Sequence, residues 1–179
     1  MKIFISGRPG IGKTTVFMRT IELLRRENID VIGFYCPEVR ERGVRIGFKI
    51  IDLIDKEERW LALVRDLKKG SCEKTVGRYC LVEEEASQIA KKLMSRIDKA
   101  SLIAIDEVGP MELKIENLRR FIEYSLSLEK PGLYVVHERI VHELARRHGV
   151  SDVYIINEFN RSYIAEEIYR KIMMYIRKL

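Results

Sequence analysis

Residues 7–14 read GRPGIGKT, and this stretch decides the fold. It fits the pattern GxxxxGK[ST], which is typical of loops that bind the phosphates of a nucleotide. Such a loop directs several backbone N–H groups at the phosphates, and its glycines leave room for that close approach. Apolar residues at strand spacing precede the stretch over 2–6, and apolar residues at helical spacing follow it over 13–27. The sequence therefore predicts a strand, a phosphate-binding loop and a helix.

Three side chains at the end of this stretch have predicted roles in holding a triphosphate. Lys13 opens the helix, so its ammonium group adds to the positive end of the helix dipole and should reach the β- and γ-phosphates. The hydroxyl of Thr14 should hold Mg²⁺, and Thr15 should lie beside the α-phosphate. The competing interpretation is a glycine-rich turn that caps an ordinary helix, but the strand and the helix on either side favour the phosphate-binding loop.

A second informative stretch is LIAIDE at 102–107, a continuous apolar run that ends in two acids. A strand that is apolar on both faces is typical of the centre of a parallel sheet. The acids then lie at the carboxyl edge of the sheet, where open α/β sheets bind their ligands. Asp106 is the natural partner of Mg²⁺, and Glu107 can face the γ-phosphate and orient a water because Gly109 and Pro110 end the strand quickly. The alternative is a pair of solvated acids at a strand end.

The rest of the chain alternates short apolar runs with helical periodicity. Strands are predicted over 30–36, 133–136 and 153–156, and helices over 84–97, 114–127, 138–148 and from about 162 to the end. Residues 38–82 break this rhythm with extended stretches at 44–53 and 76–82, which indicate an antiparallel arm. We therefore predict an α/β fold and a single domain over 1–179, in which a mostly parallel sheet has helices on both faces and carries the arm as a small insertion.

Composition excludes several classes of protein. The 179 residues are 46% hydrophobic and 34% charged, which excludes a disordered or collagen-like chain. The net charge of +6 permits a nucleic-acid partner without demanding one.

The N-terminus has only a short apolar run, and no later apolar run is long enough to cross a membrane, so we expect a cytoplasmic protein. The many Lys, Arg and Glu residues suggest a heat-adapted protein. Three cysteines, Cys36, Cys72 and Cys80, are too few and too scattered for a disulfide framework.

Three segments together give a family resemblance. GRPGIGKTT (7–15), EVRERGVRIGF (38–48) and IDEVGPMEL (105–113) resemble the small P-loop nucleoside-triphosphatases of thermophiles and archaea, whose animal relative is called cancer-related nucleoside-triphosphatase. The resemblance covers nearly the whole chain. It implies a RecA-like P-loop NTPase fold, a three-layer sandwich, that hydrolyses several nucleoside triphosphates, ATP and GTP among them, with Mg²⁺.

The candidate site combines the phosphate-binding loop with the acidic strand. Carried over by position, the resemblance implies two nucleotide-binding segments, whose residues are Gly7, Arg8, Pro9, Gly10, Ile11, Gly12, Lys13, Thr14, Thr15, Leu102, Ile103, Ala104, Ile105, Asp106, Glu107, Val108 and Gly109. Lys13 and Glu107 are the candidate catalytic residues. Thr14 and Asp106 are the candidate ligands of Mg²⁺.

Four further side chains have weaker indications. Arg40 and Arg45, on a glycine-bearing turn, could neutralise charge in the transition state as an arginine finger does, or could belong to a solvated hairpin in which Glu38 pairs with Arg40. The family often has an ENR-type triplet before its last helix, and only Asn160 and Arg161 match it here, which leaves the role of Arg161 open between a nucleotide contact and local packing. His137 ends a strand on the acidic edge and could sense the γ-phosphate or simply be a hydrogen-bonded strand end.

These residues predict a nucleoside-triphosphate phosphohydrolase of broad base specificity, because the sequence has no NKxD-type motif that would read the base. One alternative is a nucleotide or nucleoside kinase that uses the arm as a lid over a small acceptor, but Glu107 argues against it because a kinase excludes water. Another is a nucleic-acid-linked ATPase switch, whose binding would depend steeply on salt. The expected partners are nucleoside triphosphates, with no membrane, and a monomer is favoured.

Overall fold

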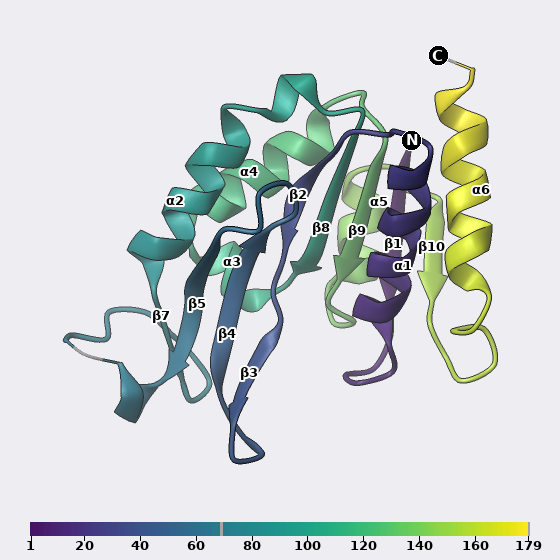
Figure 1. Cartoon of the computed structure of the whole chain (residues 1–179). Coiled ribbons are helices and arrows are strands. Elements are labelled where there is room, and N and C mark those ends of the chain that lie inside the picture. Colours follow the sequence, from purple (N-terminus) through teal and green to yellow (C-terminus); the bar gives the residue numbers. More distant parts are fainter. Residues whose placement is uncertain (69, 179) are drawn as a thin grey trace.

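The computed structural model describes residues 1–68 and 70–178, and five parallel strands form the half of its sheet that holds the candidate site (Figure 1). They are β1 (Lys2–Ser6), β2 (Val31–Tyr35), β8 (Leu102–Val108), β9 (Gly132–Val136) and β10 (Asp152–Ile155). Their order across the sheet is β10-β1-β9-β8-β2. One strand, β9, therefore separates the strand that leads into the phosphate-binding loop from the strand that ends in the acidic pair.

Helices cover both faces of this sheet, which makes three layers and confirms the predicted α/β sandwich (Figure 1). On one face lie α1 (Lys13–Arg26) and α6 (Ile164–Ile176), whose buried side chains share a core with β1. On the other face lie α2 (Glu83–Met94), α4 (Glu116–Ser127) and α5 (Val141–Arg147). Each helix turns an apolar stripe inward; in α1 the stripe includes Phe17, Ile21 and Leu24, none of which has exposed surface.

Antiparallel strands continue the sheet beyond β2 and form the predicted arm within 38–82. They are β3 (Glu38–Glu41), β4 (Val44–Asp52), β5 (Glu58–Val64), β6 (Thr75–Val76) and β7 (Tyr79–Leu81), and a 3-10 turn, η1 (Arg65–Leu67), follows β5. The sheet runs on in the order β2-β4-β5-β7-β6, while β3 pairs with β4 as a hairpin. The sequence did not indicate β3 or β5, because β3 is almost wholly exposed and the alternation of β5 is broken by a bulge in its pairing with β4.

Three element boundaries differ from the sequence prediction. The helix predicted over 114–127 begins at Glu116 as α4, and a short helix that was not predicted, α3 (Pro110–Lys114), precedes it; the extended backbone of Ile115 separates the two. The helix predicted over 84–97 ends at Met94, and a 3-10 turn, η2 (Ile97–Lys99), follows it. The apolar strand continues to Val108 rather than stopping at the acids, so both acids belong to the strand.

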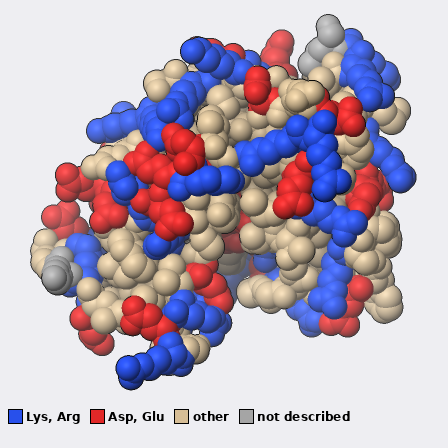
Figure 2. Space-filling model, viewed as in Figure 1, with Lys and Arg blue, Asp and Glu red and all other residues tan. Residues whose placement is uncertain are grey.

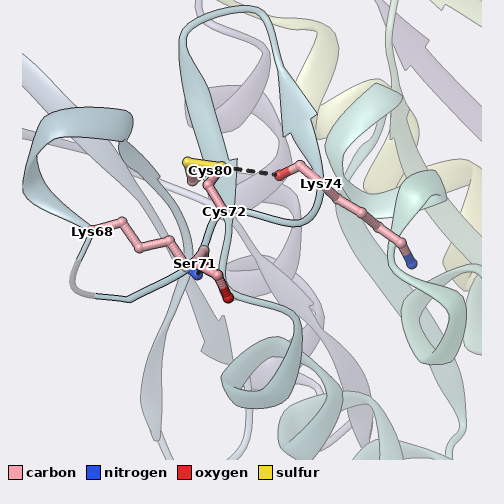
Figure 3. Close-up of a disulfide and its surroundings, with 5 residues drawn as sticks. All are labelled: Lys68, Ser71, Cys72, Lys74 and Cys80. Atoms are coloured by element: carbon pink, nitrogen blue, oxygen red, sulfur yellow. Dashed lines mark hydrogen bonds between the residues drawn. A yellow bond between two sulfur atoms is a disulfide. The ribbon is translucent and has the colours of Figure 1, made fainter.

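A disulfide joins Cys72 to Cys80 beside β6 and β7 (Figure 3). The expectation that the cysteines form no disulfide is wrong for this pair. In the β6–β7 hairpin Thr75 stands opposite Cys80, so the chain just before Thr75 passes close to Cys80. The Cα atoms of the two cysteines are 5.6 Å apart, a separation that suits a disulfide, and Cys72 Sγ lies 3.8 Å from the carbonyl oxygen of Lys74. Cys36 remains a free thiol.

The surface carries both charges in close alternation. Figure 2 shows Lys and Arg side chains mixed with Asp and Glu over the described part of one face, and this mixture is what a solvated surface requires. The same view shows the surface hollowed between the arm and the part of the sheet that carries α1. Within residues 1–68 and 70–178, no helix combines the length and the apolar character that a membrane crossing needs.

Candidate functional site

The loop at 7–14 connects β1 to α1 at the carboxyl edge of the sheet, as the sequence predicts. Gly12 caps the helix in the left-handed region at φ 109°, which a residue with a side chain rarely adopts. Gly7 has φ 144°, and a Cβ there would lie 2.8 Å from the carbonyl oxygen of Ile156. These positions therefore require glycine, and they leave the backbone N–H groups of the loop free of neighbouring side chains.

Lys13 folds back over the loop. Its ammonium group donates hydrogen bonds to the carbonyl oxygens of Gly7, at 2.9 Å, and of Arg8, at 3.2 Å. The cation therefore spans the concave side of the loop, where a phosphate chain bound by backbone N–H groups would lie. Thr14 and Thr15 follow in the first turn of α1 and are both exposed. Lys13 and Thr14 thus present a cation and a hydroxyl at one end of the helix.

A β-bulge at the end of β8 brings both acids to the same edge. Asp106 stands opposite Val135 of β9, and Val108 stands opposite Val136, so Glu107 is an extra residue in the ladder. Bulges of this kind change the direction of a side chain and are frequent beside active sites. The simple alternation of a strand would turn Glu107 away from Asp106, and the bulge removes that constraint.

Asp106 is buried and Glu107 is half-buried, and burial disfavours the ionised form of each acid. Burial is the main cause that raises the pKa of Asp106 to about 7; the nearby Glu107 acts in the same direction, and a hydrogen bond with Thr14 and the charge of Lys13 act against it. Burial also raises the pKa of Glu107, while Lys13 and His137 favour its ionised form. The loop and the acidic strand are therefore electrostatically coupled: Lys13 acts on both acids, and Thr14 contacts one of them.

We predict from these shifts that Asp106→Asn stabilises the nucleotide-free protein at alkaline pH. An acid whose pKa is higher in the folded state contributes stability at low pH and loses that contribution as the pH rises through the folded pKa, here about 7. The melting temperature in EDTA should therefore exceed that of the wild type at pH 8, and the gain should shrink toward pH 4. A variant that melts below the wild type at pH 8 would contradict the electrostatic account of Asp106.

The residues present fit Mg²⁺. Thr14 and Asp106 supply a hydroxyl and a carboxylate oxygen that already contact each other, and oxygen ligands are those that Mg²⁺ prefers. No group of three or more His, Cys, Asp or Glu side chains that could hold a metal occurs in the described part of the chain. That arrangement suits Mg²⁺, which binds through one or two protein oxygens together with phosphates and water.

His137 lies beside the acidic pair, at the end of β9. Its backbone N–H donates to the carbonyl oxygen of Val108 at 3.0 Å. Its ring nitrogen Nδ1 accepts a hydrogen bond from the backbone N–H of Arg139 at 3.3 Å, so Nε2 carries the proton when the ring is neutral. The histidine is thus a hydrogen-bonded strand end, as one of the two interpretations predicts, and it also lies near enough to Glu107 to favour its ionised form.

The other residues of the two nucleotide-binding segments fall into two groups. Arg8, Pro9 and Gly10 are exposed at the tip of the loop, and Arg8 pairs with Glu158 of the chain that follows β10. Leu102, Ile103, Ala104 and Ile105, which precede the acids in the strand, have no exposed surface, and neither has Val108. These residues hold β8 in the sheet, and they have no surface with which to contact a nucleotide.

The candidate arginines lie apart from the loop. Arg40 and Arg45 sit on the β3–β4 hairpin, and both pair with Glu38, which includes the pairing that the hairpin interpretation predicts. Arg45 also lies over the ring of Phe48, 5.4 Å from its centroid. In this structure the hairpin's own carboxylate is therefore the charge partner of both guanidinium groups. Arg161 is exposed in the turn that precedes α6.

Two features of the site were missed by sequence reasoning. Glu112, on α3, is 4% exposed and lies close to the acidic pair, although the helical pattern gave it no role. A cavity of about 560 Å³ adjoins the loop, between its first residues and the segment after β10; its lining includes Gly7, Ile11, His142, Asn157 and Phe159. Phe159 on this lining is 90% exposed, which is unusual for so large an apolar side chain.

Comparison with known proteins gives consistent results. Residues 2–169 match the NTPase family. The chain is 41% identical to nucleoside-triphosphatase THEP1 of Saccharolobus solfataricus over 173 residues, which cover 97% of this chain and 93% of that protein. It is 43% identical to nucleoside-triphosphatase THEP1 of Hyperthermus butylicus, with coverage of 95% and 90%.

Solved structures agree with this relationship. The structure of THEP1 from Aquifex aeolicus superposes with a TM-score of 0.75 at 26% identity, covering 94% of this chain and 96% of that one. The solution structure of a human cancer-related nucleoside triphosphatase also gives a TM-score of 0.75, at 28% identity, covering 96% of each chain. The family match over nearly the whole length and the similarity to THEP1 proteins confirm the resemblance seen in the sequence, and the chain belongs to the NTPase family.

Proposed function

We propose that this protein is a nucleoside-triphosphatase that hydrolyses the γ-phosphate of its substrate with the help of Mg²⁺. One observation carries the proposal: at one sheet edge, Lys13 of the loop lies close enough to both acids of β8 for its charge to lower the pKa of Asp106 and of Glu107. A phosphate-binding loop alone serves many functions, whereas a loop beside a half-buried Glu suits the activation of water. The names of the related nucleoside-triphosphatases support the same activity.

The reaction that we propose is in-line attack of water on the γ-phosphorus. The bond from oxygen to phosphorus forms, the bond to the β-bridging oxygen breaks, and the electron pair leaves with the nucleoside diphosphate. Glu107 orients the water and accepts its proton, while Lys13 and the backbone N–H groups of the loop stabilise charge on the phosphoryl oxygens. Bound Mg²⁺ would neutralise charge on the β- and γ-phosphates, and Thr14 and Asp106 would hold it.

We also propose that the base end of the nucleotide lies toward β10. The γ-phosphate must reach Glu107, on β8, and β10 lies on the opposite side of β1, so an extended triphosphate directs its base toward the segment after β10. The cavity beside the loop is there, and Phe159 offers an exposed ring at its rim. An aromatic ring stacks on any base, which suits broad base specificity.

Phe159→Ala tests this placement. Stacking on one base contributes about 1–3 kcal/mol, so we expect KM for ATP, GTP and CTP to rise by roughly 5-fold or more, by similar factors, while kcat stays within about 2-fold. Tyr163→Ala, which removes another exposed ring before α6, is the matched control. Unchanged KM values in Phe159→Ala would place the base elsewhere.

The fate of the γ-phosphate tests the proposed reaction. The protein is incubated with Mg²⁺ and γ-labelled ATP or GTP, with and without a panel of nucleosides and nucleoside monophosphates. We expect inorganic phosphate to appear at the same rate with every acceptor, and the release to stop in EDTA. Label that moves onto an acceptor would make the protein a kinase, and release that depends on added nucleic acid would favour the switch.

A further inference from the structure

The chain that follows β10 is fixed against the phosphate-binding loop. The backbone N–H of Ile156 donates to the carbonyl oxygen of Ser6 at 2.7 Å, and the carbonyl oxygen of Ile156 lies where a side chain on Gly7 would have to go. Arg8 of the loop pairs with Glu158 of the following segment. These contacts bring the chain after β10 to the cavity beside the loop, and that chain supplies part of the cavity's lining.

Two asparagines fix the turn at 157–160 through reciprocal hydrogen bonds. Asn157 Oδ1 accepts from the backbone N–H groups of Phe159, at 2.9 Å, and of Asn160, at 3.1 Å. In return, Asn160 Oδ1 accepts from the backbone N–H of Asn157 at 2.9 Å, and Asn160 Nδ2 donates to the carbonyl oxygen of Ile155 at 2.9 Å. Side-chain bonds to the backbone of this kind hold a tight turn in one conformation.

The ring of Phe159 has little packing of its own, since this residue is 90% exposed. The backbone on either side of Phe159 therefore determines where its ring stands, and that backbone is held by the two asparagines. A ligand that meets a ring already in place loses less free energy to ordering than one that must fix the ring as it binds.

We propose that Asn157 and Asn160 are positioning residues for the base of the nucleotide: they hold the turn at 157–160 so that Phe159 presents its ring at the rim of the cavity before the nucleotide binds. This inference rests on the proposed function, in which the base stacks on Phe159. Both asparagines act through Phe159, so their removal should weaken the binding of every base alike and leave the chemistry at the γ-phosphate unchanged.

Inorganic triphosphate separates the binding of the base from the binding of the phosphates. It has no base, so its Ki as a competitive inhibitor of ATP hydrolysis reports on the phosphate site alone. The ratio of KM for ATP to this Ki, measured on the same variant, therefore isolates the contribution of the base. The ratio also cancels the effect that an added charge has on the binding of the phosphates.

The two side chains use different atoms, and this difference gives a specific test. The hydrogen bonds of the Asn157 side chain all use Oδ1, which Asn157→Asp keeps, whereas Asn160→Asp loses the donor to Ile155. We expect the ratio of KM to Ki to rise by roughly 3–10-fold in Asn157→Ala, Asn160→Ala and Asn160→Asp, and to stay within about 2-fold of wild type in Asn157→Asp. In all four variants kcat should stay within about 2-fold of wild type. Asn117→Ala, on α4, makes the same change away from the turn and is the control.

The outcomes separate this inference from the proposed function. A wild-type ratio in both Asn157→Ala and Asn160→Ala would overturn the inference, and so would an equal rise in Asn157→Asp and Asn157→Ala. If an alanine variant fails to fold, the two aspartate variants still decide. Adding Asn157→Ala to Phe159→Ala should cause almost no further rise, since Asn157 acts through Phe159. An unchanged ratio in Phe159→Ala alone would refute the placement of the base, and absence of phosphate release by the wild type would refute the proposed hydrolysis.

Discussion

Lys13→Ala should abolish hydrolysis and weaken nucleotide binding so far that saturation is not reached. The ammonium group already spans the loop through its bonds to Gly7 and Arg8, so a bound phosphate chain would meet a fixed positive charge beside the backbone N–H groups. Loss of a preorganised donor at the position of the transferred phosphoryl group lowers kcat by about 10²–10³. Loss of the positive charge also weakens binding of the substrate, so kcat/KM should fall by a larger factor than kcat. Titration calorimetry with Mg–ATP and a phosphate-release assay measure the two effects.

Arg19→Ala is the control for the Lys13 variant. Arg19 is an exposed cation of the same helix and pairs with Glu166, so its removal changes the net charge equally without touching the loop. Binding and turnover should stay close to wild type. If Lys13→Ala binds nucleotide with wild-type affinity, the loop at 7–14 does not hold the phosphates and the functional proposal loses its basis.

Glu107→Gln should bind Mg–ATP normally and barely turn it over. The amide keeps the shape of the side chain but cannot accept the proton of water, and general-base catalysis contributes about 10²–10⁴ to the rate. We expect kcat to fall by a factor in that range while Kd for the nucleotide stays within a few-fold. Glu123→Gln, on the exposed face of α4, is the matched control because it makes the same chemical change away from the site. Wild-type turnover in Glu107→Gln would remove this residue from the chemistry.

The sequence predicted the loop and the sheet edge because local patterns determine them. Glycine at 7 and 12 is required by positive φ angles, and a strand and a helix must flank a loop of this kind, so a few residues carry the information. The apolar run of β8 also identified the central strand without knowledge of its neighbours. Family membership followed from three separate segments, and the family match and the fold both confirm it.

The remaining features depend on contacts between distant segments, which a local pattern does not contain. Glu112 lies outside the helix predicted over 114–127, and only the short helix α3 shows that it is buried close to the acidic pair. The Cys72–Cys80 disulfide likewise depends on the pairing of β6 with β7. The binding of Arg40 and Arg45 to one glutamate depends on the hairpin that β3 forms with β4.

Hydrolysis in ¹⁸O-labelled water is the measurement that tests the central claim most directly. The wild type and Glu107→Gln are incubated with Mg²⁺ and ATP under single-turnover conditions, and both products are analysed by mass spectrometry. If water attacks the γ-phosphorus under the control of Glu107, the label appears in inorganic phosphate, the diphosphate stays unlabelled, and the variant releases almost none. Label in the nucleoside diphosphate, or equal labelled phosphate from both proteins, would contradict the account.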